Sequence, residues 1–163
     1  MPLRPRLYAA LVFAYLVAVS VVAAQPPQRF FALTRDDVVQ LERQRAFVHH
    51  LAQRLDIPWQ FKGTSADLRV LQAIIDSKAL SASQTWELQS LGIALGDVFA
   101  NEKGLRWVIV EDEYGRDPAL RYKETSNLVF PLTMIAKRIE EGKAIDVQAI
   151  FEGVSDYIEQ FHE

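Results

Sequence analysis

The chain of 163 residues carries 18 lysines and arginines against 21 aspartates and glutamates, and it contains no cysteine. Its formal net charge of −3 disfavours a nucleic-acid-binding protein, because phosphate binding needs clustered positive charge. Half of the residues are apolar, which excludes a disordered chain of low hydrophobicity. The lack of cysteine excludes a disulfide scaffold, thiol catalysis and cysteine metal sites.

Residues 1–24 are typical of a secretory signal peptide. Arg4 and Arg6 precede an uncharged run that ends in small residues at Ala24, and Gln25-Pro26-Pro27 would break a helix after it. We therefore expect cleavage after Ala24 and export of the rest to the periplasm or the medium. An uncleaved anchor is the alternative, because a run of this length can just span a bilayer. The chain would then meet the membrane only through this segment.

Helices account for most of the predicted domain. Residues 25–33 are expected to form a short extended lead-in. Apolar residues at helical spacing then predict helices over residues 34–56, 64–80, 84–101, 131–141 and 146–161. Thr34 caps the first of these, Thr64 or Ser65 the second and Asp146 the last. Gly92 and Gly96 predict that another backbone passes close to the third helix, because a glycine costs about 1 kcal/mol in a helix interior.

A hairpin is expected between the third and fourth helices. Residues 105–110 are rich in β-branched and aromatic side chains, residues 111–118 have turn chemistry, and residues 119–125 form the returning strand, with Leu120 and Tyr122 on one face. Two strands alone are marginal in water, so the hairpin must pack on the helices. We expect an α+β fold, with helices around a small antiparallel sheet, as a single domain over residues 34–163.

Carboxylates cluster near the hairpin turn. Glu111, Asp112 and Glu113, with Asp117 nearby, could bind Ca²⁺ or supply a general acid and base. The calcium-loop pattern fails, because Tyr114 falls where an oxygen ligand is required. Runs of charge usually mark exposed faces, so a solvated turn is the favoured interpretation.

Other catalytic patterns are missing from the sequence. His49 and His50 are neighbours that point about 100° apart on a helix, not the i, i+4 pair of a zinc protease. The sequence contains no nucleophile-elbow motif, no phosphate-loop motif and no dinucleotide-binding motif. We therefore expect neither a metal nor a cofactor. Trp59, Trp86 and Trp107 could line a carbohydrate or peptide groove. Core packing is favoured for Trp107, whereas Trp59, in a loop, is left open.

Residues 91–153 resemble a bacterial family of uncharacterised proteins, the domain-of-unknown-function 3806 family. The resemblance rests on Leu91-Gly92, Leu95-Gly96, Leu105, Trp107, Asp112, Gly115, Asp117-Pro118-Ala119-Leu120, Val129-Phe130-Pro131, Lys137-Arg138 and Glu141-Gly142. It implies a small exported or envelope protein without an assigned activity. It gives no catalytic residues to transfer.

The leading hypothesis is a non-enzymatic exported domain that binds a protein partner through the hairpin tip, since loops on a rigid scaffold often carry function. The candidate contact residues are Glu113, Tyr114, Arg116, Asp117, Arg121 and Lys123. The alternative is a small hydrolase or lyase that acts on an envelope polymer. It would use carboxylates from Glu111, Asp112, Glu113 or Asp117. A third possibility is an envelope-tethered structural protein, if residues 1–24 stay attached.

Overall fold

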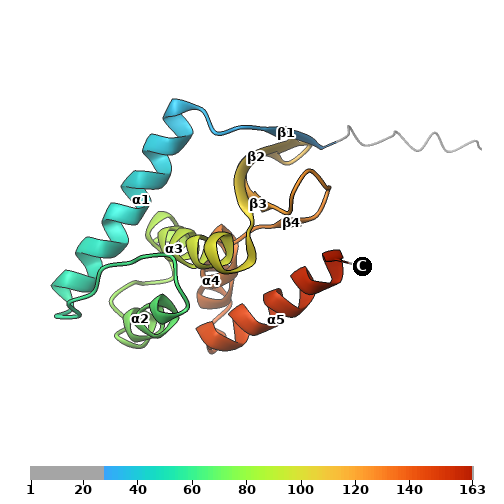
Figure 1. Ribbon diagram of the computed structural model, residues 1–163. Coiled ribbons are helices and arrows are strands. Elements are labelled where there is room, and N and C mark those ends of the chain that lie inside the picture. Colours follow the sequence, from blue (N-terminus) through green and yellow to red (C-terminus); the bar gives the residue numbers. More distant parts are fainter. Residues whose placement is uncertain (1–27, 163) are drawn as a thin grey trace, which may run out of the picture.

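The structure, a computed structural model, describes residues 28–162 and has the predicted α+β architecture (Figure 1). The predicted signal peptide lies outside the described residues. The elements in chain order are β1 (Arg29–Phe31), α1 (Arg35–Arg54), α2 (Ala66–Asp76), α3 (Thr85–Lys103), β2 (Arg106–Asp112), β3 (Gly115–Arg121), β4 (Leu128–Val129), α4 (Leu132–Glu140), α5 (Val147–Glu159) and a final 3₁₀ turn (Gln160–His162). Among the helices of the described residues, none has the length and apolar character that a membrane crossing requires.

Helix α3 lies at the centre of the molecule. Figure 1 shows α1 on one side of it and α5 on the other, with the sheet at one end. Fully buried side chains along α3 include Leu88, Leu91, Leu95 and Phe99. The main core surrounds this helix, and it takes in side chains from the sheet and from the other helices.

Local hydrogen bonding explains where two of the helices begin. The backbone N–H of Asp37 donates to Thr34 Oγ1 at 3.3 Å, and the N–H of Thr34 donates to Asp37 Oδ2 at 2.8 Å, which forms a capping box. At α5, Asp146 Oδ1 accepts a hydrogen bond of 2.9 Å from the N–H of Ala149. Both predicted caps are confirmed. Helix α2 is shorter than predicted, since Lys78 adopts a left-handed backbone (φ +53°) that cannot continue it.

The strands of the hairpin are longer than predicted, and its turn is shorter. Residues 111–112 belong to β2 and residues 115–118 to β3, so only Glu113 and Tyr114 make the turn. Pro118 lies in β3 beyond the part that pairs with β4, where a missing N–H is tolerated. The predicted returning strand was wrong beyond Arg121: the N–H of Thr125 donates to the carbonyl of Tyr122 at 3.1 Å, which makes a turn there.

Two more strands complete an antiparallel sheet of order β1-β2-β3-β4. Part of the predicted lead-in forms β1, which pairs with β2 from Arg29 opposite Glu111 to Phe31 opposite Ile109. One face of the sheet joins the main core through Leu120 and Val129. The other face carries a smaller apolar cluster of Val108, Val110 and Ala119, against which Phe30 and Leu128 pack.

The glycines of α3 allow the start of α4 to approach closely. A Cβ atom on Gly92 would lie 2.5 Å from the carbonyl oxygen of Pro131 and 2.7 Å from the Cα of Leu132. A Cβ on Gly96 would meet side chains instead, with Trp107 Cζ2 at 2.5 Å and Pro131 Cγ at 2.8 Å. The predicted close backbone approach is confirmed at Gly92. It fixes where β4 ends and α4 begins.

Candidate functional site

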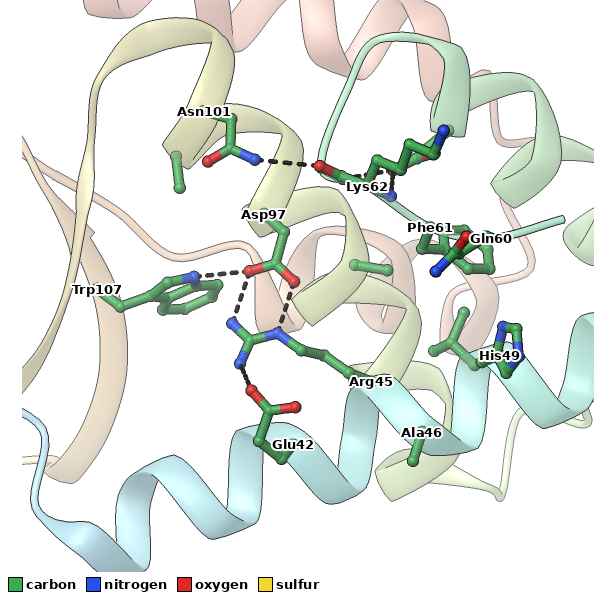
Figure 2. A pocket seen from close by; sticks show the side chains of 15 residues that line it. Glu42, Arg45, Ala46, His49, Gln60, Phe61, Lys62, Asp97, Asn101 and Trp107 are labelled. Atoms are coloured by element: carbon green, nitrogen blue, oxygen red, sulfur yellow. Dashed lines mark hydrogen bonds and ion pairs between the residues drawn. The ribbon is translucent and has the colours of Figure 1, made fainter.

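A cavity of about 680 Å³ lies between the middle of α1, the loop before α2 and the second half of α3 (Figure 2). Its walls combine charged and amide side chains with aromatic rings. Those that matter most here are Glu42, Arg45, His49, Gln60, Lys62, Asp97, Asn101 and Trp107. They come from four separate parts of the chain, so packing of the elements builds the site.

Asp97 is the centre of this cavity. Arg45 donates from Nε to Asp97 Oδ2 and from Nη2 to Oδ1, both at 2.7 Å, and Trp107 Nε1 donates to Oδ1 at 2.9 Å. Figure 2 shows Arg45 reaching from α1 toward Asp97, with the Trp107 indole on the other side. These bonds to Asp97 raise the pKa of Arg45, whose Nη1 also donates to Glu42 at 2.9 Å. Both oxygens of Asp97 are therefore occupied, and its carboxylate joins α1, α3 and β2.

A double-mutant cycle would measure this link. We expect Asp97→Ala and Arg45→Ala to couple by about 1.5 kcal/mol in urea unfolding, because bidentate charge-assisted hydrogen bonds are stronger than neutral ones. The value is modest because about a quarter of each side chain is exposed. Additive effects of the two substitutions would contradict the link. As a control, the surface pair Arg106 and Glu124 should couple far more weakly.

Asp67 holds the loop that forms one wall of the cavity. This fully buried carboxylate accepts hydrogen bonds from Trp59 Nε1 at 2.7 Å and from the backbone N–H groups of Lys62, Gly63 and Thr64 at 2.9, 2.7 and 3.2 Å. The predicted N-cap at Thr64 or Ser65 is confirmed in position at Ser65, but the Ser65 side chain makes no capping hydrogen bond. The loop and the start of α2 are instead held by Asp67.

The tryptophans divide between packing and the cavity walls. Trp59 packs against the core, and the Arg69 guanidinium lies 4.9 Å from its ring centre. It also lines a hollow of about 600 Å³ that shares His49 and Gln60 with the first cavity. The two hollows adjoin along α1, and together they are called the trough. Trp107 is partly buried against the core. Trp86 is 39% exposed, and its ring meets Phe47 edge-on at 5.3 Å.

The adjacent histidines share one hydrogen-bonding partner. Gln53 lies 3.1 Å from His49 Nε2 through its amide nitrogen and 3.3 Å from His50 Nδ1 through its amide oxygen. Within residues 28–162, no group of three or more His, Asp or Glu side chains is placed to hold a metal ion. His49 thus contributes a polar group to the trough, whereas His50 lines neither hollow.

A family model described as "Domain of unknown function (DUF3806)" matches residues 67–151. The chain belongs to this family. The match is consistent with the resemblance seen at residues 91–153, and it extends that resemblance back through α2. It contains Asp67, Asp97 and Trp107 but stops short of α1, which supplies Arg45. The trough is therefore built jointly by the matched region and by α1 and the loop that follows it, both of which precede the match.

A crystal structure of a protein from Bacteroides thetaiotaomicron VPI-5482, determined at 1.50 Å resolution, has a similar fold. The two chains are 21% identical with a TM-score of 0.71, over 82% of this chain and 49% of the other. This chain thus spans about half the length of that protein, and the likeness concerns the fold alone. No curated protein matches the sequence.

The predicted contact residues of the hairpin fall into two groups in this DUF3806 domain. Glu113 and Tyr114 form the turn, where Tyr114 is 84% exposed, and Asp117 is exposed nearby. Lys123 is also exposed, and its ammonium lies 4.7 Å from the ring centre of Tyr122. Glu113, Tyr114 and Asp117 are open to solvent at the tip of the hairpin. Lys123 lies after β3, at the opposite end of the hairpin, where Arg121 pairs with Arg106.

Arg116 and Arg121 are engaged in the fold. Arg116 donates two hydrogen bonds of 2.7 Å to the carboxylate of Asp37 at the start of α1. Arg121 lies 4.0 Å over the Phe30 ring and donates to the carbonyl oxygens of Glu124 and Thr125 at 2.8 and 2.6 Å. Both arginines thus tie the hairpin to its neighbours. The contacts of Arg116 with Asp37 and of Arg121 with Phe30 join distant parts of the chain, and no local sequence pattern indicated them.

The hairpin carboxylates do not converge on the cavity. Glu111 faces Arg29 at 3.6 Å, and Asp112 accepts hydrogen bonds from Gln28 Nε2 at 3.2 Å and from the N–H of Tyr114 at 2.9 Å. Neither these two nor Glu113 or Asp117 lines the cavity of Figure 2. A general acid and base drawn from them would act at an exposed hairpin.

The Asp37–Arg116 pair predicts a pH dependence of stability. Hydrogen bonds from Arg116, and then from Thr34, hold the pKa of Asp37 well below its ordinary value of 3.8. A carboxyl group whose pKa is lowered by folding adds stability above its unfolded pKa, and this stability is lost as the pH falls below about 4. The urea midpoint should therefore drop more between about pH 6 and pH 3 in the wild type than in Arg116→Gln. Arg106→Gln, which removes a different surface pair, should keep the wild-type pH profile. Equal pH profiles for Arg116→Gln and the wild type would contradict the assignment.

Proposed function

We propose that the chain is an exported domain that binds a protein partner and has no catalytic activity of its own. The observation that carries the proposal is the open trough along α1, whose central carboxylate, Asp97, accepts two hydrogen bonds from Arg45 and one from Trp107. A general acid or base needs a carboxylate that can exchange a proton with a substrate. Asp97 is instead paired with a guanidinium through both oxygens, and it holds the walls of the trough in place.

The dimensions of the trough fit an extended segment of a partner. From Glu42 to Gln53 it follows about 16 Å of helix, at 1.5 Å per residue. An extended peptide of about five residues covers that length. Amide side chains at Gln53, Gln60 and Asn101 line it, and their donors and acceptors suit the N–H and C=O groups of a peptide backbone.

The rings beside the trough add apolar contact area. Phe61 lines the first cavity and Trp59 the adjoining hollow, and both are partly buried. Aromatic side chains next to polar groups are common in protein interfaces. Lys62 is exposed on the same wall and forms no ion pair with a described residue, so it is available to a carboxylate of the partner.

The hairpin tip is a second surface for the same role. Tyr114 projects from the turn with Glu113 and Asp117 beside it, and an exposed tyrosine is a frequent anchor in interfaces. The tip and the trough are separate surfaces, so a partner could engage one without the other.

Export rests on the signal-type sequence of residues 1–24. An intact mass that begins at Gln25 in protein from its own host would support export with cleavage, whereas retention of Met1 would favour the tethered alternative.

Site-specific photocrosslinking in the host would test the binding proposal. A photoreactive phenylalanine derivative is placed at Gln60 in the trough, at Tyr114 on the tip, and at Gln148 on α5 as an exposed control. We expect one discrete protein adduct from Gln60 and none from Gln148. An adduct from Tyr114 alone would place binding at the hairpin and overturn the role of the trough. Absence of adducts from both, or equal labelling at all three positions, would overturn the proposed function.

A further inference from the structure

A separate groove of about 320 Å³ lies between β4, α4 and α5, and its lining is mainly apolar. Leu128 and Met134 form one side, and Val154 and Tyr157 of α5 form the other. Phe130 lines the groove just before the start of α4, and Lys137 and Arg138 line it near the end of that helix. None of these residues lines the trough along α1.

Two aromatic side chains of the groove are exposed although their backbones are well held. Phe130 is 38% exposed and Tyr157 is 49% exposed. The position of Phe130 is set by the next residue, Pro131, which abuts the glycines of α3. The ring of Tyr157 lies edge-on to Phe161 at 4.7 Å. Rigid, exposed rings around an apolar groove favour docking of another apolar group.

The charge of the two cations of the groove is only partly offset within residues 28–162, where both contribute, after Lys143, to lowering the pKa of Glu141. Neither Lys137 nor Arg138 forms an ion pair there, and Arg138 Nη1 instead donates to the carbonyl of Met134 at 2.6 Å. The acids that follow are engaged elsewhere: Glu141 pairs with Lys143 at 2.6 Å, and Glu140 accepts from Thr85 Oγ1 at 3.3 Å. On a chain of negative net charge, this leaves local positive charge at an apolar groove.

We infer that this groove docks a short segment of a partner protein in which large apolar side chains are followed by acidic residues. From Phe130 to Arg138 the groove follows about 12 Å of chain at the helical rise, which three or four extended residues span. The apolar side chains of the segment enter between Met134 and Val154, and its carboxylates meet Lys137 and Arg138. This groove would bind such a segment whether or not the trough along α1 binds a partner.

A membrane surface is the other class of ligand that combines apolar and anionic groups. It is less suited here, because the apolar side chains line a hollow between two helices and do not project as a patch that could enter a bilayer. Glu140 and Glu141 at the end of α4 would also face an anionic surface. A peptide segment can enter the groove and leave these acids in water.

The probe for the test is a fluorescein-labelled peptide, Gly-Leu-Phe-Asp-Glu-Gly, titrated with the protein recovered from its host and followed by anisotropy. We expect saturable binding that the double variant Lys137→Glu/Arg138→Glu weakens at least about tenfold. Arg43→Glu, an exposed charge reversal on α1, should leave affinity within about twofold. Lys137→Gln/Arg138→Gln gives a milder variant, and circular dichroism checks that each variant is folded.

Peptides with altered chemistry separate the possible outcomes. Gly-Leu-Phe-Lys-Lys-Gly tests the charge, and Gly-Ser-Ser-Asp-Glu-Gly tests the apolar part. We expect both to bind at least about tenfold more weakly than the probe. Equal binding of all three peptides, or no effect of the double variant, would overturn the inference. So would binding to phosphatidylglycerol vesicles that the double variant abolishes, without peptide binding. The trough variant Lys62→Glu should leave peptide affinity unchanged, so failure here and failure of the proposed function are distinguishable.

Discussion

Asp67→Ala is expected to lower the free energy of unfolding by about 3–4 kcal/mol, which is a large effect for one side chain. The reason is that the buried carboxylate accepts four hydrogen bonds, from the Trp59 indole and from three successive backbone N–H groups. Its removal leaves these donors without partners where water enters poorly. Urea unfolding followed by tryptophan fluorescence would measure the loss.

The rate of proteolysis in the loop gives an independent measurement of the effect of Asp67→Ala. Lys62 lies in the loop that Asp67 holds, so Asp67→Ala should accelerate tryptic cleavage after Lys62, because the freed loop opens more often. Asp67→Asn should fall between wild type and alanine, since its amide keeps one acceptor oxygen. Asp76→Ala, at an exposed aspartate that ends α2, is the matched control and should change stability little. A wild-type stability and digestion pattern for Asp67→Ala would show that the loop is held by other contacts.

Gly92→Ala is expected to destabilise the domain by about 2–3 kcal/mol, although alanine is the better helix former. The added methyl group would lie 2.5 Å from the Pro131 carbonyl oxygen and 2.7 Å from the Cα of Leu132, and backbone atoms cannot move aside as a flexible side chain can. Helices α3 and α4 must therefore separate. Thermal and urea unfolding of the variant would measure the cost.

Gly153→Ala is the matched control for this prediction. Gly153 lies inside α5, and a Cβ atom there would meet nothing within 4 Å. The same substitution should therefore stabilise the protein by about 0.5–1 kcal/mol, through helix propensity alone. If both glycine variants gained stability, the close approach of α3 and α4 at Gly92 would be contradicted.

Helix α1 completes the walls of the trough. The family match covers Asp97 and Trp107, but the guanidinium that pairs with Asp97 comes from Arg45, outside the match. Without α1, Asp97 would lose both hydrogen bonds from Arg45. The helix is thus part of the site as well as of the fold.

Local hydrogen bonding made several features predictable from the sequence. The helix starts at Thr34 and Asp146 depend on side chains that bond to N–H groups within three residues. Gly92 signalled a close approach because a glycine in a helix interior is costly unless space requires it. Asp67 could have been found too, since Thr64 and Asp67 repeat the T-x-x-D spacing of Thr34 and Asp37, and the N–H of Thr64 does donate to Asp67.

The pairing of the strands could not be predicted from such local patterns in the sequence. Residues 111–118 have the composition of a turn, yet most of them are strand, because β1 and β3 supply hydrogen-bonding partners on either side of β2. The acidic run therefore lies along strand ends and meets Arg29 and Gln28 from a distant segment. Composition reports what a segment prefers when alone, whereas pairing depends on which strands lie beside it.

By itself, the sequence determined the α+β class, the helix starts, the close approach at Gly92 and the family resemblance, because each depends on neighbouring residues or on a recognisable order of motifs. Only the tertiary structure decided the trough, where Arg45 meets Asp97 across 52 positions of the chain, and the pairing of Arg116 with Asp37 across 79. An arginine can satisfy its guanidinium with any carboxylate in reach. Which one it meets depends on how the helices and the sheet pack.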